Sequence, residues 1–228
     1  MRRCVGLALI GLAAPVAAAQ SQAAVSGQVA LIERQGAERS DLRDAVVYLE
    51  PLDHAVRGTR DGELRQASIA MTGREFVPHI LIVLAGGSVS FPNQDPFSHN
   101  VFSNAGKGFD LGLYRRGVSK SAEFATAGVY PVYCNIHSRM VSFVIAVPSP
   151  LAVFVNADGR FAIPDVPAGR YRMYTWHERA TNRFSHEIDV PAAGLTGLRI
   201  VLDARAYVSG PHLNKFGLPY AATRVDRY

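Results

Sequence analysis

The stretch at residues 129–140, VYPVYCNIHSRM, constrains this chain more than any other part of it. It places Cys134, His137 and Met140 at a C-x-x-H-x-x-M spacing, and a second histidine, His99, lies upstream in FPNQDPFSHNVFS. One thiolate, two imidazoles and one thioether form a ligand set that suits a soft metal ion. The pattern predicts a metal site in which one short loop supplies three ligands and a neighbouring strand end supplies the fourth.

Copper is the metal that this set favours. Cu(I) and Cu(II) prefer different partners, and a thiolate combined with imidazoles can serve both oxidation states. Zinc is an alternative because cysteine and histidine also bind it, but zinc rarely uses a thioether, so Met140 favours copper. A sandwich that keeps these residues without binding a metal is the other alternative.

The N-terminus predicts export. A basic start, a short apolar run and an Ala-Ala-Ala site indicate a secretory signal peptide over residues 1–19, cleaved after Ala19, and hence a periplasmic protein. Cleavage removes Cys4 and leaves Cys134 as the sole thiol, so no internal disulfide can form in the mature chain. No later apolar run is long enough for a transmembrane segment.

The composition indicates an all-β protein. Apolar residues make up 48% of the chain and charged residues 19%, and 20 glycines and 13 prolines separate short β-branched and aromatic runs, as in sandwiches and barrels. The formal charge of +5 is spread along the chain without a basic block that contains aromatic residues, which argues against nucleic acid as a partner.

Along the chain, residues 25–52 predict two strands and residues 53–62 a linker. HILIVLA, at residues 79–85, predicts a strand that is buried on both faces or lies in the core of a sandwich, and the polar, glycine-rich residues 104–117 predict a long connection. The C-terminal tail, residues 205–228, has no clear period and is expected to lie along the surface or to be mobile.

Residues 66–147 resemble a cupredoxin domain of the plastocyanin and amicyanin kind, because FSHNVFS is similar to the first-histidine segment of that family and VYCNIHSRM to its ligand loop. The resemblance implies a Greek-key β-sandwich that binds one type 1 copper ion. The implied copper ligands are His99, Cys134, His137 and Met140. It also implies that Asn100 holds the ligand loop through hydrogen bonds and that Tyr133 is the aromatic residue before the cysteine.

The flanking segments resemble the transthyretin-like module of carboxypeptidase regulatory domains, through VSGQV and DAVVYLEP before the copper segment and NADGRFAIPDVPAGRYRMYTW after it. We therefore expect residues 24–52 and 151–204 to share a second β-sandwich into which the cupredoxin domain is inserted; two sandwiches in series are the alternative. The motifs PNQD, FDLGLY, CNIHSRM and YTWH together are similar to proteins named methylamine utilization protein.

These features predict an electron-transfer protein, not an enzyme. It would carry single electrons between periplasmic redox partners such as a c-type cytochrome or a dehydrogenase. By the resemblance, His137 is the ligand at the solvent edge, and the adjacent Arg139 is expected to favour docking of an acidic partner. The alternatives are copper storage or delivery, and a cell-envelope recognition protein in which the copper site is secondary.

Overall fold

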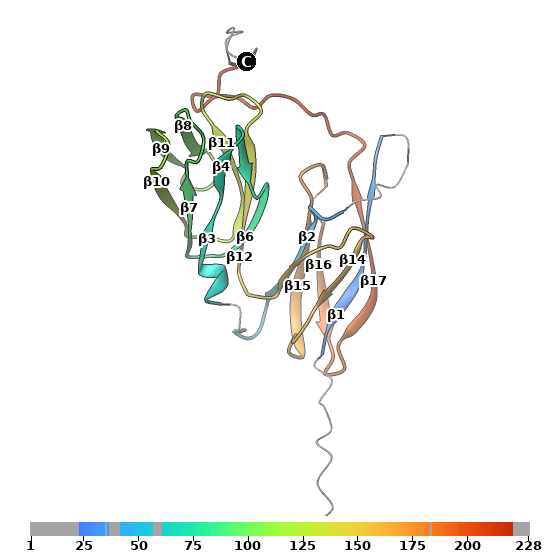
Figure 1. Cartoon of the computed structure of the whole chain (residues 1–228). Helices are drawn as coiled ribbons and strands as arrows, with labels where there is room; N and C mark the ends of the chain where they lie inside the picture. Colours follow the sequence, from blue (N-terminus) through green and yellow to red (C-terminus); the bar gives the residue numbers. More distant parts are fainter. Residues whose placement is uncertain (1–22, 35, 37–41, 57–60, 183, 221–228) are drawn as a thin grey trace, which may run out of the picture.

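The chain is built of β-strands, which confirms the predicted all-β fold class. The computed structural model describes residues 23–34, 36, 42–56, 61–182 and 184–220, and its strands gather in two units (Figure 1). The predicted signal peptide lies outside the described residues. Within those ranges the helical content is one 3₁₀ turn, η1 (Glu63–Arg65), and no helix there is long and apolar enough to cross a bilayer.

The central unit is a β-sandwich made by the middle of the chain. Its five-stranded sheet has the order β6-β12-β11-β8-β9, its three-stranded sheet has the order β10-β7-β3, and β4 and β5 form a hairpin. The strands are β3 (Gln66–Ser68), β4 (Ala70–Thr72), β5 (Glu75–Val77), β6 (Ile80–Leu84), β7 (Gly87–Pro92), β8 (His99–Ser103), β9 (Phe109–Tyr114), β10 (Ser119–Phe124), β11 (Gly128–Cys134) and β12 (Val141–Val147). One buried cluster, which includes Phe91, Val132 and Val144, fills the space between the sheets.

The flanking unit is a second sandwich, made from both ends of the described chain. Its sheets have the orders β13-β2-β15-β16 and β14-β1-β17. The strands are β1 (Val25–Ile32), β2 (Val46–Pro51), β13 (Ala152–Phe154), β14 (Arg160–Ile163), β15 (Gly169–Trp176), β16 (Phe184–Val190) and β17 (Leu195–Asp203). Because β1 and β2 pair with β13–β17 and not with the central strands, the N-terminal strands and the C-terminal strands share one core.

One expectation was wrong. Residues 104–117 contain a strand, β9, which pairs antiparallel with β8 from His99↔Tyr114 to Ser103↔Phe109. Phe109 and Leu111 pack against the central core, whereas Gly112 adopts a φ of +70° and Asp110 is exposed. The polar residue and the glycine between the apolar positions hid this edge strand in the sequence, since both residue types are depleted in strands.

The two units pack against each other through strands that are buried on both faces. In β2, Val47 and Leu49 belong to the core of the flanking unit, whereas Val46 and Tyr48 belong to a third cluster between the units. Strand β6 of the central unit is also buried on both faces, as HILIVLA predicted. Its Ile80, Ile82 and Leu84 lie in the third cluster, and its Val83 lies in the central core. Successive side chains of a strand point to opposite faces, so each strand contributes to two cores.

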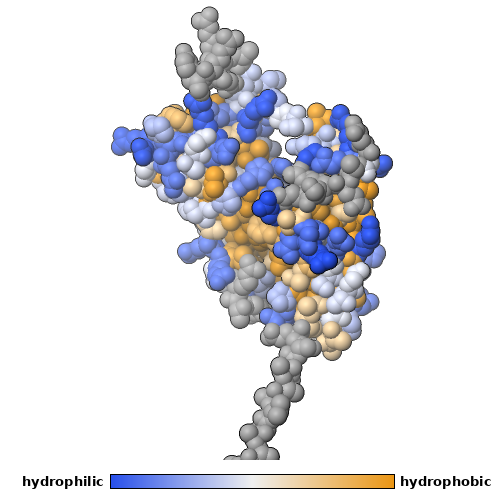
Figure 2. Space-filling view, turned by 45° about the vertical axis from the view of Figure 1, so that its right-hand side comes forward, coloured by the Kyte–Doolittle hydropathy of each residue, from blue (hydrophilic) through white to orange (hydrophobic). Residues whose placement is uncertain are grey.

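The boundary between the units also carries aromatic and ionic contacts. The rings of Phe143 and Trp176 lie 5.1 Å apart, and His79 Nε2 lies 2.8 Å from Glu178 Oε2. The Glu178 carboxylate raises the pKa of His79, against the effect of partial burial. Figure 2 shows hydrophobic residues gathered toward the middle of one face and hydrophilic residues along its upper margins.

Ile145→Ala should test whether this boundary is a true core. Ile145 is 0% exposed in the third cluster, so we expect truncation to lower the free energy of unfolding by about 2–5 kcal/mol. Urea denaturation followed by the fluorescence of Trp176, which lies at the same boundary, measures the change. Val201→Ala, at a position that is 41% exposed on β17, is the control and should change stability by less than about 0.5 kcal/mol. An equally small loss in Ile145→Ala would mean that the units are loosely joined.

Candidate metal centre

The loop that joins β11 to β12 presents three of the predicted ligands. Strand β11 ends at Cys134 and β12 begins at Val141, and two backbone hydrogen bonds close the loop between them. The Cys134 amide donates to the Met140 carbonyl (3.1 Å), and the Met140 amide donates to the His137 carbonyl (3.1 Å). Cys134 and Met140 are 0% and 2% exposed and belong to the central core, so both ends of the loop are anchored in the sandwich.

The thiol and the two imidazoles converge on one point. Cys134 Sγ lies 3.4 Å from His137 Nδ1 and 3.6 Å from His99 Nδ1, and the three ligand atoms all lie within 4.8 Å of one another. His99 comes from the start of β8, which pairs with β11 next to the cysteine through Cys134↔Val101. This pairing brings two segments separated by 35 residues to the same end of the sandwich.

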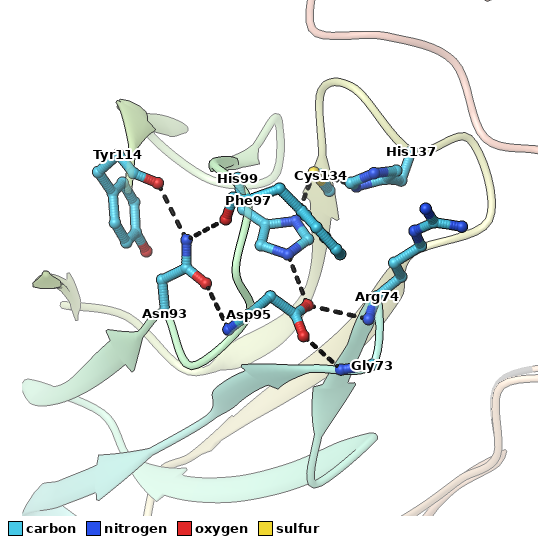
Figure 3. A network of polar contacts seen from close by, with 9 residues as sticks. All are labelled: Gly73, Arg74, Asn93, Asp95, Phe97, His99, Tyr114, Cys134 and His137. Atoms are coloured by element: carbon cyan, nitrogen blue, oxygen red, sulfur yellow. Dashed lines mark hydrogen bonds and ion pairs between the residues drawn. The ribbon is translucent and has the colours of Figure 1, made fainter. Parts of the chain in front are cut away.

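An aspartate orients His99 from behind (Figure 3). Asp95 Oδ2 accepts a hydrogen bond of 2.8 Å from His99 Nε2, and both side chains are buried. A carboxylate can only accept, so Nε2 carries the proton and Nδ1 offers its lone pair toward Cys134. Metal-binding histidines are commonly oriented in this way by a carboxylate on the other ring nitrogen.

Backbone donors hold Asp95 in its ionised form. The amides of Gly73 and Arg74 donate to Asp95 Oδ1 (2.6 Å) and Oδ2 (3.0 Å), and Figure 3 shows both amides converging on the carboxylate with His99. Burial opposes ionisation, but the three hydrogen bonds outweigh it and lower the pKa of Asp95. The β4–β5 turn thereby holds Asp95 in place, and Asp95 in turn orients His99.

Asn93 shapes the loop that carries Asp95. Its Nδ2 donates to the carbonyls of Phe97 (2.9 Å) and Tyr114 (3.1 Å), and its Oδ1 accepts from the Asp95 amide (3.0 Å). The side chain is 1% exposed, so these bonds satisfy a buried amide and tie the loop to β9. The loop between β7 and β8 is therefore held in one conformation by buried hydrogen bonds.

The surroundings of Cys134 suit a thiol that loses its proton to solvent when the sulfur binds a metal ion. Burial raises the pKa of the thiol, and hydrogen bonds from the amides of Ile136, Asn100 and His137 offset part of that effect. The same amides would stabilise a thiolate once a cation compensates for the burial. Metal binding at this site therefore releases a proton.

The geometry fits a small soft cation. Metal–nitrogen bonds of about 2.0–2.1 Å and metal–sulfur bonds of about 2.3 Å, spread at trigonal to tetrahedral angles, separate neighbouring ligand atoms by about 3.6–3.8 Å. The two S···N distances of 3.4 and 3.6 Å are close to that range. A thiolate with two imidazoles is the ligand set of trigonal copper sites, so the residues present fit copper.

Aromatic and cationic side chains cover the site. The ring of Phe97 lies 5.1 Å from that of His99 and 5.8 Å from that of His137, and the guanidinium of Arg74 lies 5.2 Å from the Phe97 ring. The Arg74 side chain extends beneath His137 in Figure 3. His137 is partly exposed while His99 is fully buried, so His137 lies at the solvent edge of the site.

The other predicted site residues lie near the loop. Arg139 is exposed, and the Tyr133 ring lies 5.6 Å from that of Phe102. Asn100 was expected to hold the ligand loop through hydrogen bonds. Its backbone amide hydrogen-bonds to the Cys134 thiol, and its side-chain Nδ2 donates to Asp110 (2.6 Å).

Sequence reasoning missed Asp95, Arg74 and the C-terminal tail as parts of the site. A carboxylate four residues before a ligand histidine was a usable signal for Asp95, because such histidines need an acceptor on the other nitrogen. Arg74 carried no such signal, since it reaches the site only through the β4–β5 turn, where its φ is +64°.

The known proteins that this chain matches are solved structures. No protein-family model matches the chain, and no curated protein does. The chain is similar to a purple cupredoxin from Nitrosopumilus maritimus, with 26% identity over 36% of this chain and 99% of that one and a TM-score of 0.33. It is also similar to amicyanin from Paracoccus versutus, with 18% identity over 44% of this chain and 98% of that one and a TM-score of 0.34. A copper-containing nitrite reductase from Thermus scotoductus shares 21% identity over 43% of this chain and 25% of that one, with a TM-score of 0.35.

Asp95→Asn should weaken metal binding without removing a ligand. The asparagine side chain can still accept the hydrogen bond from His99. It lacks the negative charge that strengthens electron-pair donation from the imidazole to the metal, so we expect the affinity for Cu(I) to fall by about 10–100-fold. Competition against a chromophoric Cu(I) chelator measures this. Asp158→Asn, at an exposed turn before β14, is the matched control and should leave affinity unchanged. Equal affinities for both variants would contradict the role of Asp95.

Proposed function

We propose that this protein is an exported type 1 copper protein that carries single electrons between redox partners in the periplasm. The observation that supports it is the convergence of one thiol and two Nδ1 atoms at S···N distances of 3.4 and 3.6 Å at the end of a β-sandwich. Copper bound there would supply a one-electron couple between Cu(I) and Cu(II).

In this proposal each ligand has a distinct role. His99, Cys134 and His137 form the trigonal set, and Met140, buried at the end of the same loop, is the weak axial ligand that tunes the potential. The buried network behind His99 and the backbone bonds within the loop keep these groups in place when the charge on the site changes. A site whose ligands do not move suits electron transfer.

The partner in this proposal is a redox protein such as a c-type cytochrome or a dehydrogenase. His137 is the ligand at the solvent edge, and the exposed Arg139 stands two residues along the same loop. Electrons would enter or leave by this edge, and the guanidinium would attract an acidic surface. Arg74, packed on Phe97 at the same edge, adds a second positive charge.

The proposal extends to the domain organisation. We assign residues 66–147 to an inserted cupredoxin domain and residues 24–52 with 151–204 to a transthyretin-like module. The pairing of β1 with β14 and β17, and of β2 with β13 and β15, supports the insertion over two sandwiches in series. A single flanking core that needs both segments supports it as well.

A recognition role is the second candidate, and one feature favours it. A groove of about 770 Å³ lies at the boundary of the two units. Its lining includes five aromatic side chains, among them the stacked rings of Tyr48 and Tyr174 4.9 Å apart, and Glu50 accepts a hydrogen bond from the Tyr174 hydroxyl (2.8 Å). Loss of partner or glycan binding in Trp176→Ala, with copper retained, would support this role.

Cys134→Ser should remove the spectroscopic signature of the site. The mature chain with Cu(II) should show an intense thiolate-to-copper absorption band and an electron paramagnetic resonance spectrum with a narrow copper hyperfine splitting. In the variant the band should vanish, because a hydroxyl cannot replace the covalent thiolate bond. A mature chain that stays colourless with Cu(II) would overturn the electron-carrier proposal, and tight Zn(II) binding in its place would favour the zinc alternative.

Arg139→Glu should slow electron transfer with an acidic c-type cytochrome. Reversing one charge at the docking edge should lower the association rate by about three- to tenfold at low ionic strength, and added salt should shrink the difference. Stopped-flow measurement of cytochrome oxidation at several salt concentrations records both effects. Arg160→Glu, exposed on the flanking unit, is the charge-matched control. The same rate in both variants would remove Arg139 from the docking face.

A further inference from the structure

The C-terminal tail does not stay with the unit from which it emerges. Strand β17 ends at Asp203 in the flanking unit, and the chain then crosses to the end of the central unit that carries the ligand loop (Figure 1). Tyr207 still packs against the flanking core, whereas Val208 is 75% exposed in the crossing. From His212 to Tyr220 the tail lies against the ligand loop.

The tail donates hydrogen bonds to four residues of that loop. The His212 amide donates to the Ser138 carbonyl (2.9 Å), and His212 Nε2 lies 3.0 Å from the His137 carbonyl oxygen. Further along, the Lys215 amide donates to Asn135 Oδ1 (2.9 Å), and the Tyr220 hydroxyl donates to the Cys134 carbonyl (2.8 Å). Two of the four acceptors are backbone carbonyls of predicted ligands, Cys134 and His137.

Ring packing and an ion pair reinforce these bonds. The His212 ring lies 4.5 Å from that of Tyr133, the residue before the cysteine, and 5.4 Å from that of Tyr220. Lys215 Nζ pairs with Asp110 at 2.5 Å, and the same carboxylate accepts from Asn100 Nδ2. The tail thus contacts the loop after β11 directly, and it is linked to the start of β8 through Asp110 on β9, which also binds Asn100.

The tail has a defined conformation of its own. Asn214 Oδ1 accepts from the amides of Phe216 (2.9 Å) and Leu218 (3.1 Å), and the Gly217 amide donates to the Asn214 carbonyl (2.9 Å). Gly217 has a φ of +75°, a conformation that favours glycine. Because the Asn214 side chain holds this turn, His212 and Tyr220 can contact the loop from either side of the turn without a large loss of conformational entropy.

We propose that residues 211–220 are a clamp that holds the ligand loop from outside the sandwich, with His212 and Tyr220 as positioning residues. The inference rests on the proposed function, which it deepens: the flanking unit carries the clamp, so one role of that unit is to fix the geometry of the metal site. Within the loop, two backbone hydrogen bonds restrain the chain between Cys134 and Met140. The tail adds four from outside, so the clamp supplies much of the restraint on the ligand carbonyls.

The first experiment compares the full mature chain with a chain that ends at Val208. The shorter chain keeps Tyr207 and the flanking core but lacks the clamp. We expect it to release Cu(I) to a chelator at least about tenfold faster, because each lost hydrogen bond accounts for a few-fold change. The thiolate-to-copper band should also shift in position and broaden, which a purely structural role elsewhere in the fold would not cause.

Tyr220→Phe makes the test local. It removes the single hydroxyl that reaches the Cys134 carbonyl, and we expect Cu(I) release about threefold to tenfold faster, with a shifted band and reduction potential. Tyr207→Phe is the matched control, because that tyrosine lies in the same tail but packs on the flanking unit beneath Arg179. It should match the unaltered chain in every readout.

Hydrogen exchange of the metal-free chains separates this inference from the proposed function. The Cys134 and Met140 amides, both hydrogen-bonded within the loop, should exchange faster in the shorter chain than in the full chain, whether or not copper binds. If neither chain binds copper but the loop amides lose protection in the shorter chain, the result supports the clamp and contradicts the proposed copper function. If copper release, the absorption band and amide exchange are all the same in both chains, the clamp is overturned.

Discussion

The hydrogen bond from His99 Nε2 to Asp95 is the interaction on which the metal centre depends. It sets which ring nitrogen faces Cys134, and amides of the β4–β5 turn offset part of the cost of burying the carboxylate. Asn93 then holds the intervening loop against β9. Polar contacts from the turn to the aspartate, and from the aspartate to the histidine, therefore hold one side of the site in place without a metal, which is the preorganisation that metal sites commonly use.

The other side of the site is prepared by the backbone. Hydrogen bonds within the loop close it between Cys134 and Met140, and the tail adds its own from the far end of the chain. The anchoring of that tail depends on the flanking unit, which packs on the central unit through strands whose alternate side chains enter two different cores. The second sandwich thereby becomes part of the support of the candidate metal site, beyond any recognition role of the groove at the boundary of the two units.

Much of this arrangement could be predicted from the sequence. The features that could not be predicted have one physical cause in common. The all-β class followed from short β-branched runs separated by glycine and proline, and the two-sided burial of HILIVLA followed from its lack of alternation. β9 was missed because Asp110 and Gly112 interrupt its apolar pattern, and the edge position of that strand tolerates both. The hydrogen bond from the Asn100 side chain to Asp110 could not be predicted either, because β9 brings that residue alongside.

The sequence by itself determined which residues are candidate ligands, because C-x-x-H-x-x-M within one loop is a local property of the chain and its chemistry favours a particular metal. Tertiary structure alone decided what surrounds that set. Strand pairing carries His99 to Cys134, a turn 21 residues before Asp95 supplies a donor to it, and Tyr220 reaches a carbonyl 86 residues away. Such contacts depend on sheet order and on the path of a tail without periodicity, and neither leaves a pattern in the residues that make them.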